Sequence, residues 1–78
     1  MKVKLPGVQN ISIRGDYIRL DSLLKLASVT STGGEAKLLI QNGEVFVDNE
    51  ICVQRGKKLR NGNVVRYCGD TLIVRQSV

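Results

Sequence analysis

A chain of 78 residues allows one domain with one small core, because so short a chain buries only a little over ~60% of its unfolded surface. Val, Ile and Leu must form that core, since the chain has one Phe, two Tyr and no Trp, and a deep aromatic-lined ligand pocket is not expected. Twelve Lys and Arg against seven Asp and Glu give a net charge of +5, which favours a polyanionic partner.

The cysteine pattern argues against a disulfide framework and a metal site. Cys52 and Cys68 lie in apolar, strand-like runs, and the sequence contains no histidine. We therefore predict two buried free thiols, which pack as small hydrophobic side chains and suit a reducing cytoplasm. The sequence contains neither a signal-like N-terminal segment nor an apolar stretch of membrane-spanning length.

The N-terminal part predicts a loosely held segment over residues 1–10 and a weak strand at about residues 11–14. A first helix is predicted from Arg19, with Lys25 on its exposed side. Its apolar residues recur at the i, i+3, i+4, i+7 spacing of one helical face: Leu20, Leu23, Leu24 and Ala27. Hydroxylated, β-branched and glycyl residues then break this helix over residues 28–34.

A second helix is predicted directly after this break. Thr32 and Glu35 have the spacing of a capping box, and Gly43 is well placed to end the helix in the left-handed conformation. Its apolar face is formed by Ala36, Leu39 and Ile40. Lys37 is expected on the outward side.

After Gly43 the apolar period falls to two, which predicts strands. A β-hairpin is expected from Val45 to Val53 around the turn Asp48-Asn49. Two further strands, residues 64–68 and 71–74, flank a tight turn at Gly69-Asp70, and Asn61-Gly62 forms another turn before them. The sequence predicts an α+β fold with two short packed helices, a β-hairpin and a small, mostly antiparallel sheet of four or five strands.

Several spaced motifs resemble the RNA-binding domain of ribosomal protein S4, the alpha-L motif. They are Arg19-Leu20-Asp21, residues 32–37, Leu39-Ile40, residues 43–49 and residues 59–63, and the likeness runs from about residue 18 to 74. The nearest likeness is to a branch of small stand-alone bacterial proteins linked to ribosomes and their assembly, whose glycine turn and Arg-Gly-Lys-Lys-Leu segment are similar to residues 31–34 and 55–59. The resemblance implies docking on structured RNA, which is ribosomal RNA or, as the alternative, transfer RNA, and it implies no reaction.

Residues 55–66 contain five basic side chains and no acidic one, which is the strongest binding signal in the sequence. Together with the resemblance it predicts the following RNA-binding residues: Arg19, Lys25, Thr32, Gly33, Gly34, Lys37, Arg55, Lys57, Lys58 and Arg60. Gly33 stands where many relatives carry a basic residue, and backbone amides at the helix N-terminus could bind a phosphate instead.

Several of these residues, and the exposed aromatic residue Phe46, also have a purely structural interpretation. The basic run can be a solvated loop, Lys25 and Lys37 can be ordinary exposed helix residues, and Thr32 is first a helix cap. Phe46 faces away from its neighbours Val45 and Val47, and it either covers a sheet face or stacks on a base.

No common catalytic constellation is present. Gly56-Lys57 is not a nucleotide-binding loop, because Ile51 stands where its first glycine would be and Lys58 where Ser or Thr would be. We expect a non-enzymatic, monomeric RNA-binding protein with no cofactor, metal, membrane or small-molecule substrate. The alternative is a protein-interaction module whose basic face binds an acidic surface on an RNA-processing machine.

Overall fold

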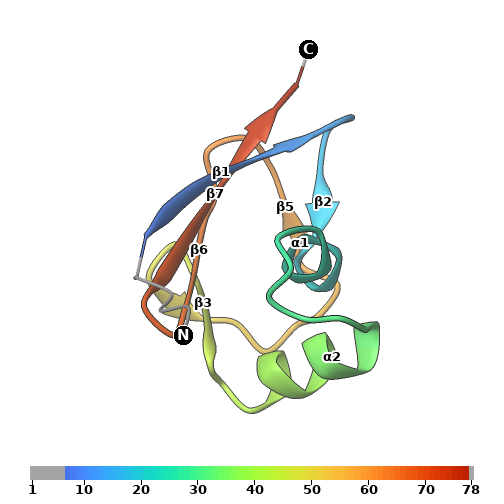
Figure 1. Cartoon of the computed structure of the whole chain (residues 1–78), viewed down its shortest axis with the longest axis vertical. Helices are drawn as coiled ribbons and strands as arrows, with labels where there is room; N and C mark the ends of the chain where they lie inside the picture. The colour runs from blue at the N-terminus through green and yellow to red at the C-terminus, as the bar shows by residue number, and fades with distance from the viewer. Residues whose placement is uncertain (1–6, 78) are drawn as a thin grey trace, which may run out of the picture.

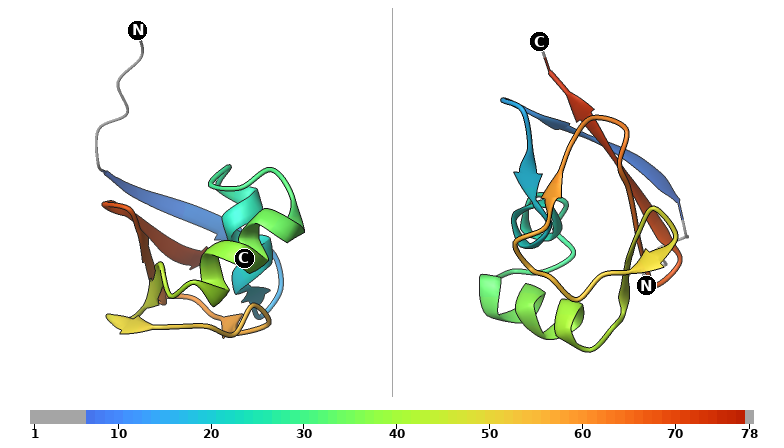
Figure 2. Two further views of the ribbon diagram at one scale, coloured as in Figure 1. Left: turned by 90° about the horizontal axis from the view of Figure 1, so that it is seen from below. Right: turned by 180° about the vertical axis from the view of Figure 1, so that it is seen from behind.

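The computed structural model describes residues 7–77, with two helices on one side of a curved sheet (Figures 1 and 2). The elements in chain order are β1 (Val8–Ile13), β2 (Ile18–Arg19), α1 (Leu20–Leu26), α2 (Gly33–Gln41), β3 (Val45–Val47), β4 (Glu50–Ile51), β5 (Lys58–Leu59), β6 (Val64–Tyr67) and β7 (Asp70–Gln76). The main sheet has the strand order β1-β7-β6-β3-β4, and β2 pairs with β5 in a second, two-stranded sheet. Only the β1–β7 pair is parallel among the strands of residues 7–77. The predicted α+β class is confirmed.

The core lies between the helices and the inner face of the main sheet. Strand alternation builds that inner face, since Val45 and Val47 are buried while Phe46 between them is exposed. The buried hydrophobic residues are Ile13, Leu20, Leu23, Leu24, Ala36, Ile40, Val45, Val47, Leu59, Val65, Leu72 and Val74. The prediction of a core made from aliphatic side chains is confirmed.

Helix α2 begins and ends where the sequence predicts. The Thr32 hydroxyl accepts a hydrogen bond from the backbone N–H of Glu35 at 3.2 Å, and the Glu35 carboxylate accepts one from the N–H of Ser31 at 3.1 Å. Gly43 follows the helix with φ of +75°, a conformation that costs glycine little. Local chemistry at both ends therefore fixes this helix.

The first strand is longer than the sequence indicates. Residues 8–10, which were predicted to be loosely held, belong to β1 and pair with β7 in parallel, with Val8 opposite Thr71. Polar side chains at Gln9, Asn10 and Ser12 hide this strand from pattern analysis, because edge pairing depends on backbone groups. Gly7 accepts a hydrogen bond from the N–H of Thr71 at 2.9 Å, and the rest of the predicted loosely held segment, residues 1–6, lies outside the described residues.

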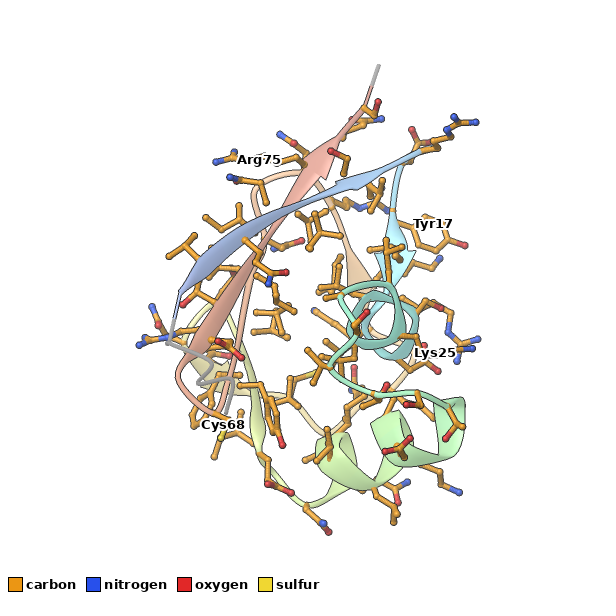
Figure 3. All side chains as sticks on the ribbon, in the orientation of Figure 1. Tyr17, Lys25, Cys68 and Arg75 are labelled. Atoms are coloured by element: carbon orange, nitrogen blue, oxygen red, sulfur yellow. The ribbon has the colours of Figure 1, made fainter. Side chains whose placement is uncertain are left out.

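The prediction of two buried thiols is wrong. Tyr67 pairs with Asp70, so the two-residue turn is Cys68-Gly69 and not Gly69-Asp70. Both turn residues have positive φ, +51° and +86°, as a two-residue hairpin turn requires. The turn directs the Cys68 side chain to solvent at the end of β6 (Figure 3), while Cys52 is half-buried after β4.

The β3–β4 hairpin ends earlier than predicted. Strand β4 stops at Ile51, and Val53 is exposed.

Candidate nucleic-acid interface

The basic run after the hairpin is attached to the start of α1. Arg19 precedes this helix in extended conformation and provides no side-chain cap. The first N–H groups of a helix need partners from elsewhere, and here Leu20 and Asp21 donate to the carbonyls of Lys57 at 2.9 Å and Arg55 at 3.1 Å. The backbone of residues 55–57 is therefore a fixed part of the fold, while Lys57 remains exposed.

The carboxylate of Asp21 holds two arginines. Its Oδ2 accepts from Nη2 of Arg19 at 3.2 Å and from Nε of Arg55 at 3.1 Å, and its Oδ1 accepts from the N–H of Ser22 at 2.8 Å. Asp21 is buried, whereas the side chains of Arg19 and Arg55 remain 52% and 42% exposed. Each guanidinium is thus oriented by a buried anion and still open to solvent. The basic run has no acidic residue in sequence, but in space Arg55 has Asp21, 34 positions earlier, as its partner.

Two glycines lie beside these guanidinium groups. A Cβ atom on Gly33 would lie 3.7 Å from Nη2 of Arg55, and one on Gly56 would lie 3.7 Å from Nη2 of Arg19. Gly33 is the first residue of α2, so Arg55 lies beside the positive end of that helix. Within residues 7–77 the backbone N–H groups of Gly33 and Gly34 make no hydrogen bond. The N-terminus of α2 and Arg55 together offer an anion two backbone amides and one guanidinium group in one place.

The small β2–β5 sheet adds more cations. Arg19 stands directly opposite Lys58, and both point outward because their neighbours Ile18 and Leu59 point toward the core. Like charges directly opposite across a ladder are destabilising. Stability of the fold therefore does not explain why these two residues face each other.

An aromatic side chain that sequence analysis missed lies beside this ladder. Tyr17 is exposed, and its ring centroid is 4.9 Å from Nζ of Lys58 and 5.8 Å from Cζ of Arg60. These contacts join residues more than 40 positions apart, so no local pattern could have indicated them.

The structure brings most of the predicted binding residues together. We call this surface the basic face and define it by Arg19, Gly33, Gly34, Arg55, Lys57, Lys58 and Arg60. Thr32 caps the same helix end, and Lys37 is exposed one turn after Gly33 on the same side of α2. Lys57 also borders a hollow of about 380 Å³ beside the β3–β4 turn.

Lys25 is exposed in the last turn of α1, one turn after Asp21 on the same side of the helix. It makes no ion pair with another of residues 7–77. A cation there complements the negative end of the helix dipole. Both interpretations of Lys25, an RNA contact and an ordinary helix residue, stay predictions.

Phe46 lies on the outer face of the main sheet, away from the helices. It stands opposite Arg66 across the β3–β6 ladder and borders a hollow of about 350 Å³ near the Cys68-Gly69 turn. The basic face does not include this region, so base stacking by Phe46 stays a prediction.

Over residues 7–77, no group of three or more possible metal ligands occurs, and neither helix has the length and apolarity needed to span a membrane.

Comparison with known proteins identifies the family. Residues 11–75 match the family model of the S4 domain, and the chain belongs to this family. It is 44% identical over 59 residues to a Bacillus subtilis (strain 168) protein named "Probable ribosome maturation protein RlbA", covering 76% of this chain and 83% of that protein. The fold is similar to the solution structure of YbcJ from E. coli, whose alpha-L motif is described as involved in RNA binding. That match has a TM-score of 0.61 and 24% identity, and it covers 96% and 94% of the two chains.

The role of Asp21 can be tested by the substitution Asp21→Asn. The amide keeps the shape but replaces a charged acceptor for two guanidinium groups, so we expect the free energy of unfolding to fall by about 1–3 kcal/mol, with solvent screening limiting the loss. Urea unfolding measures this as a lower midpoint at constant slope. Asp16→Asn makes the same charge change at an exposed position and should alter stability by less than ~0.5 kcal/mol. Equal stability of the two variants would contradict the assignment.

Proposed function

We propose that this protein binds structured RNA, in particular ribosomal RNA, through the basic face, and that it acts in ribosome maturation without catalysing a reaction. The observation that carries the proposal is the pair of half-exposed guanidinium groups on Asp21, one of which lies against the first residue of α2. The name of the B. subtilis relative and the motif described for YbcJ support the same role. We further propose that the protein acts as a monomer in the cytoplasm.

The α2 N-terminus would receive one RNA phosphate. The amides of Gly33 and Gly34 point out of the helix end, and the absence of Cβ atoms allows a phosphate to approach the backbone closely. Arg55 lies within contact distance of this end and can donate to the same phosphate, since a guanidinium has five N–H groups and Asp21 uses one of them.

The lysines would add affinity that depends on salt. Lys37, Lys57 and Lys58 are exposed, and none forms an ion pair with another described residue. Each phosphate that they neutralise releases condensed counterions. Arginines held by Asp21 and lysines without an ion pair therefore have separate tasks: the former fix the position of the RNA backbone, and the latter strengthen its binding.

The main competing function is binding to an acidic protein surface. Cations alone would serve either partner, but the glycine-lined helix end beside Arg55 suits a compact tetrahedral anion better than a carboxylate on a bulky protein surface. This feature favours RNA.

Crosslinking in cells tests the proposal directly. Ultraviolet irradiation followed by sequencing of the attached RNA should recover ribosomal RNA, and ribonuclease should release the protein from ribosomal particles in sedimentation. Enrichment of transfer RNA would change the assigned target. Continued co-sedimentation with a partner after complete RNA digestion would support the protein-binding alternative instead.

Replacing Lys57 and Lys58 together by Ala should weaken binding and flatten its salt dependence. We expect the slope of log affinity against log salt to fall by roughly one to two units, at ~0.7 to ~0.9 for each lost phosphate contact. Stability should change by less than ~0.5 kcal/mol for each exposed lysine. Titration of an rRNA fragment at several salt concentrations measures the slope.

A matched control has the same net charge. The double substitution of Arg66 and Arg75 by Ala also lowers the net charge from +5 to +3. These arginines lie on the outer face of the sheet, and Arg75 lies well away from Tyr17 (Figure 3). Its salt slope should stay close to that of the parent. Equal losses in both double variants would mean that net charge, and not the basic face, determines affinity.

The glycine end of α2 permits a test that separates binding from stability. A Cβ on Gly34 has its nearest neighbour, Oγ1 of Thr32, at 3.8 Å, so Gly34→Ala fits without strain and should preserve or raise stability. If a phosphate approaches the amides there, RNA affinity should fall about tenfold, equivalent to one charge-assisted hydrogen bond of ~1.5 kcal/mol. Gln41→Ala, at the other end of α2, is the control. Unchanged affinity of a folded Gly34→Ala variant would leave these glycines a structural role alone.

A further inference from the structure

We propose that Tyr17, Lys58 and Arg60 form a subsite for one unpaired nucleotide, with its base stacked on the tyrosine ring and its phosphate neutralised by the two cations. This inference rests on the proposed RNA binding and extends it from the phosphate backbone to a base. Neither the charge pattern nor the family motifs include Tyr17.

The two cations lie over the ring of Tyr17. Lys58 is in β5, Arg60 directly follows this strand, and Leu59 between them is fully buried. Their charged groups are 4.9 and 5.8 Å from the ring centroid, so a base that stacks on the face they cover takes the place of an exposed side chain, which then turns to the phosphate. A hydrogen bond of 2.6 Å from the N–H of Arg60 to Oδ1 of Asn63 fixes the backbone there.

Core packing does not explain Tyr17. The second tyrosine, Tyr67, packs against the hydrophobic core, whereas Tyr17 is not part of that cluster and is 45% exposed. Its side chain points outward beside β2 in Figure 3. An exposed cation–π contact contributes little to stability, and a ring that only supported the fold would not need to stay accessible.

The immediate surroundings are cationic on the side of the ladder. Arg19 stands opposite Lys58, which links the subsite to the Asp21-held arginines and the rest of the basic face. The nearest acidic residue in sequence, Asp16, is exposed and makes no ion pair with any of residues 7–77. An incoming phosphate therefore meets Lys58 in β5, Arg60 directly after it and Arg19 in β2.

These groups suit a nucleotide better than a simple anion. Every nucleobase has a π-face that can stack on an aromatic ring, and base–aromatic stacking tolerates any base. A base inside a duplex has both faces occupied, so the ring would select a nucleotide from a loop, bulge or end. The helix end at Gly33 can then hold the backbone of the adjoining structured RNA.

The experiment compares two RNA probes and two substitutions at one position. The probes are a stem-loop with a uridine loop and the same stem-loop with an abasic loop. Tyr17→Leu removes the ring and keeps apolar bulk, and Tyr17→Phe keeps the ring. We expect Tyr17→Leu to lose about 5- to 100-fold in affinity for the uridine loop, with no further change for the abasic loop and an unchanged salt slope. Tyr17→Phe should bind like the parent.

Tyrosine fluorescence gives an independent readout. The chain contains no Trp and only two Tyr, so Tyr67→Phe leaves Tyr17 as the single emitter. Stacking predicts quenching by the uridine loop but not by the abasic loop. Unchanged affinity of Tyr17→Leu, an equal loss with both probes, or equal quenching by both would overturn the subsite. Failure of the parent to bind either stem-loop or ribosomal RNA would instead overturn the proposed function itself.

Discussion

The contact between Asp21 and two arginines connects the fold to its surface chemistry. A buried carboxylate without partners would be costly, so the structure must keep Arg19 and Arg55 in place. The same bonds fix the basic run against the helix pair. The carbonyls of Lys57 and Arg55 add to this, because they accept hydrogen bonds from the first turn of α1. Guanidinium groups already oriented in this way lose little freedom when a ligand binds.

Two cationic residues stand opposite each other on a two-residue ladder. Arg19 and Lys58 are direct partners there, and their chain neighbours Leu20 and Leu59 are fully buried and hold both segments in register. The charged groups turn to separate partners, Arg19 to Asp21 and Lys58 to the Tyr17 ring. Core packing and these partners keep two exposed cations side by side, which suits a polyanionic ligand.

Short-range features could be predicted from the sequence, and long-range ones could not. The capping box of α2, the stop at Gly43 and the hairpin turn at Asp48-Asn49 depend on neighbouring residues, whose spacing is visible in the chain. Strands β2 and β5 have two residues each, too few to show a period. Arg55 lies 34 positions from Asp21, and the two cations at Tyr17 lie more than 40 positions from it, so these contacts arise only from the tertiary fold. Cys68 was misassigned because a one-residue shift of a turn reverses a side chain from core to solvent.

The difference between fixed and mobile cations bears on how such a small domain could select its RNA. Exposed lysines on flexible stems can follow many phosphate positions and therefore discriminate little between RNA shapes. Arg55 has no such freedom, since Asp21 fixes its Nε and the first residue of α2 lies against its outer nitrogen. Selection must then come from the few points whose separation the fold determines: the α2 N-terminus, the two guanidinium groups and the ring of Tyr17. An RNA binds best when its phosphates and one unpaired base match that spacing at the same time. The fold keeps the contact points at fixed separations, so the protein cannot shift one of them to compensate for a mismatch at another.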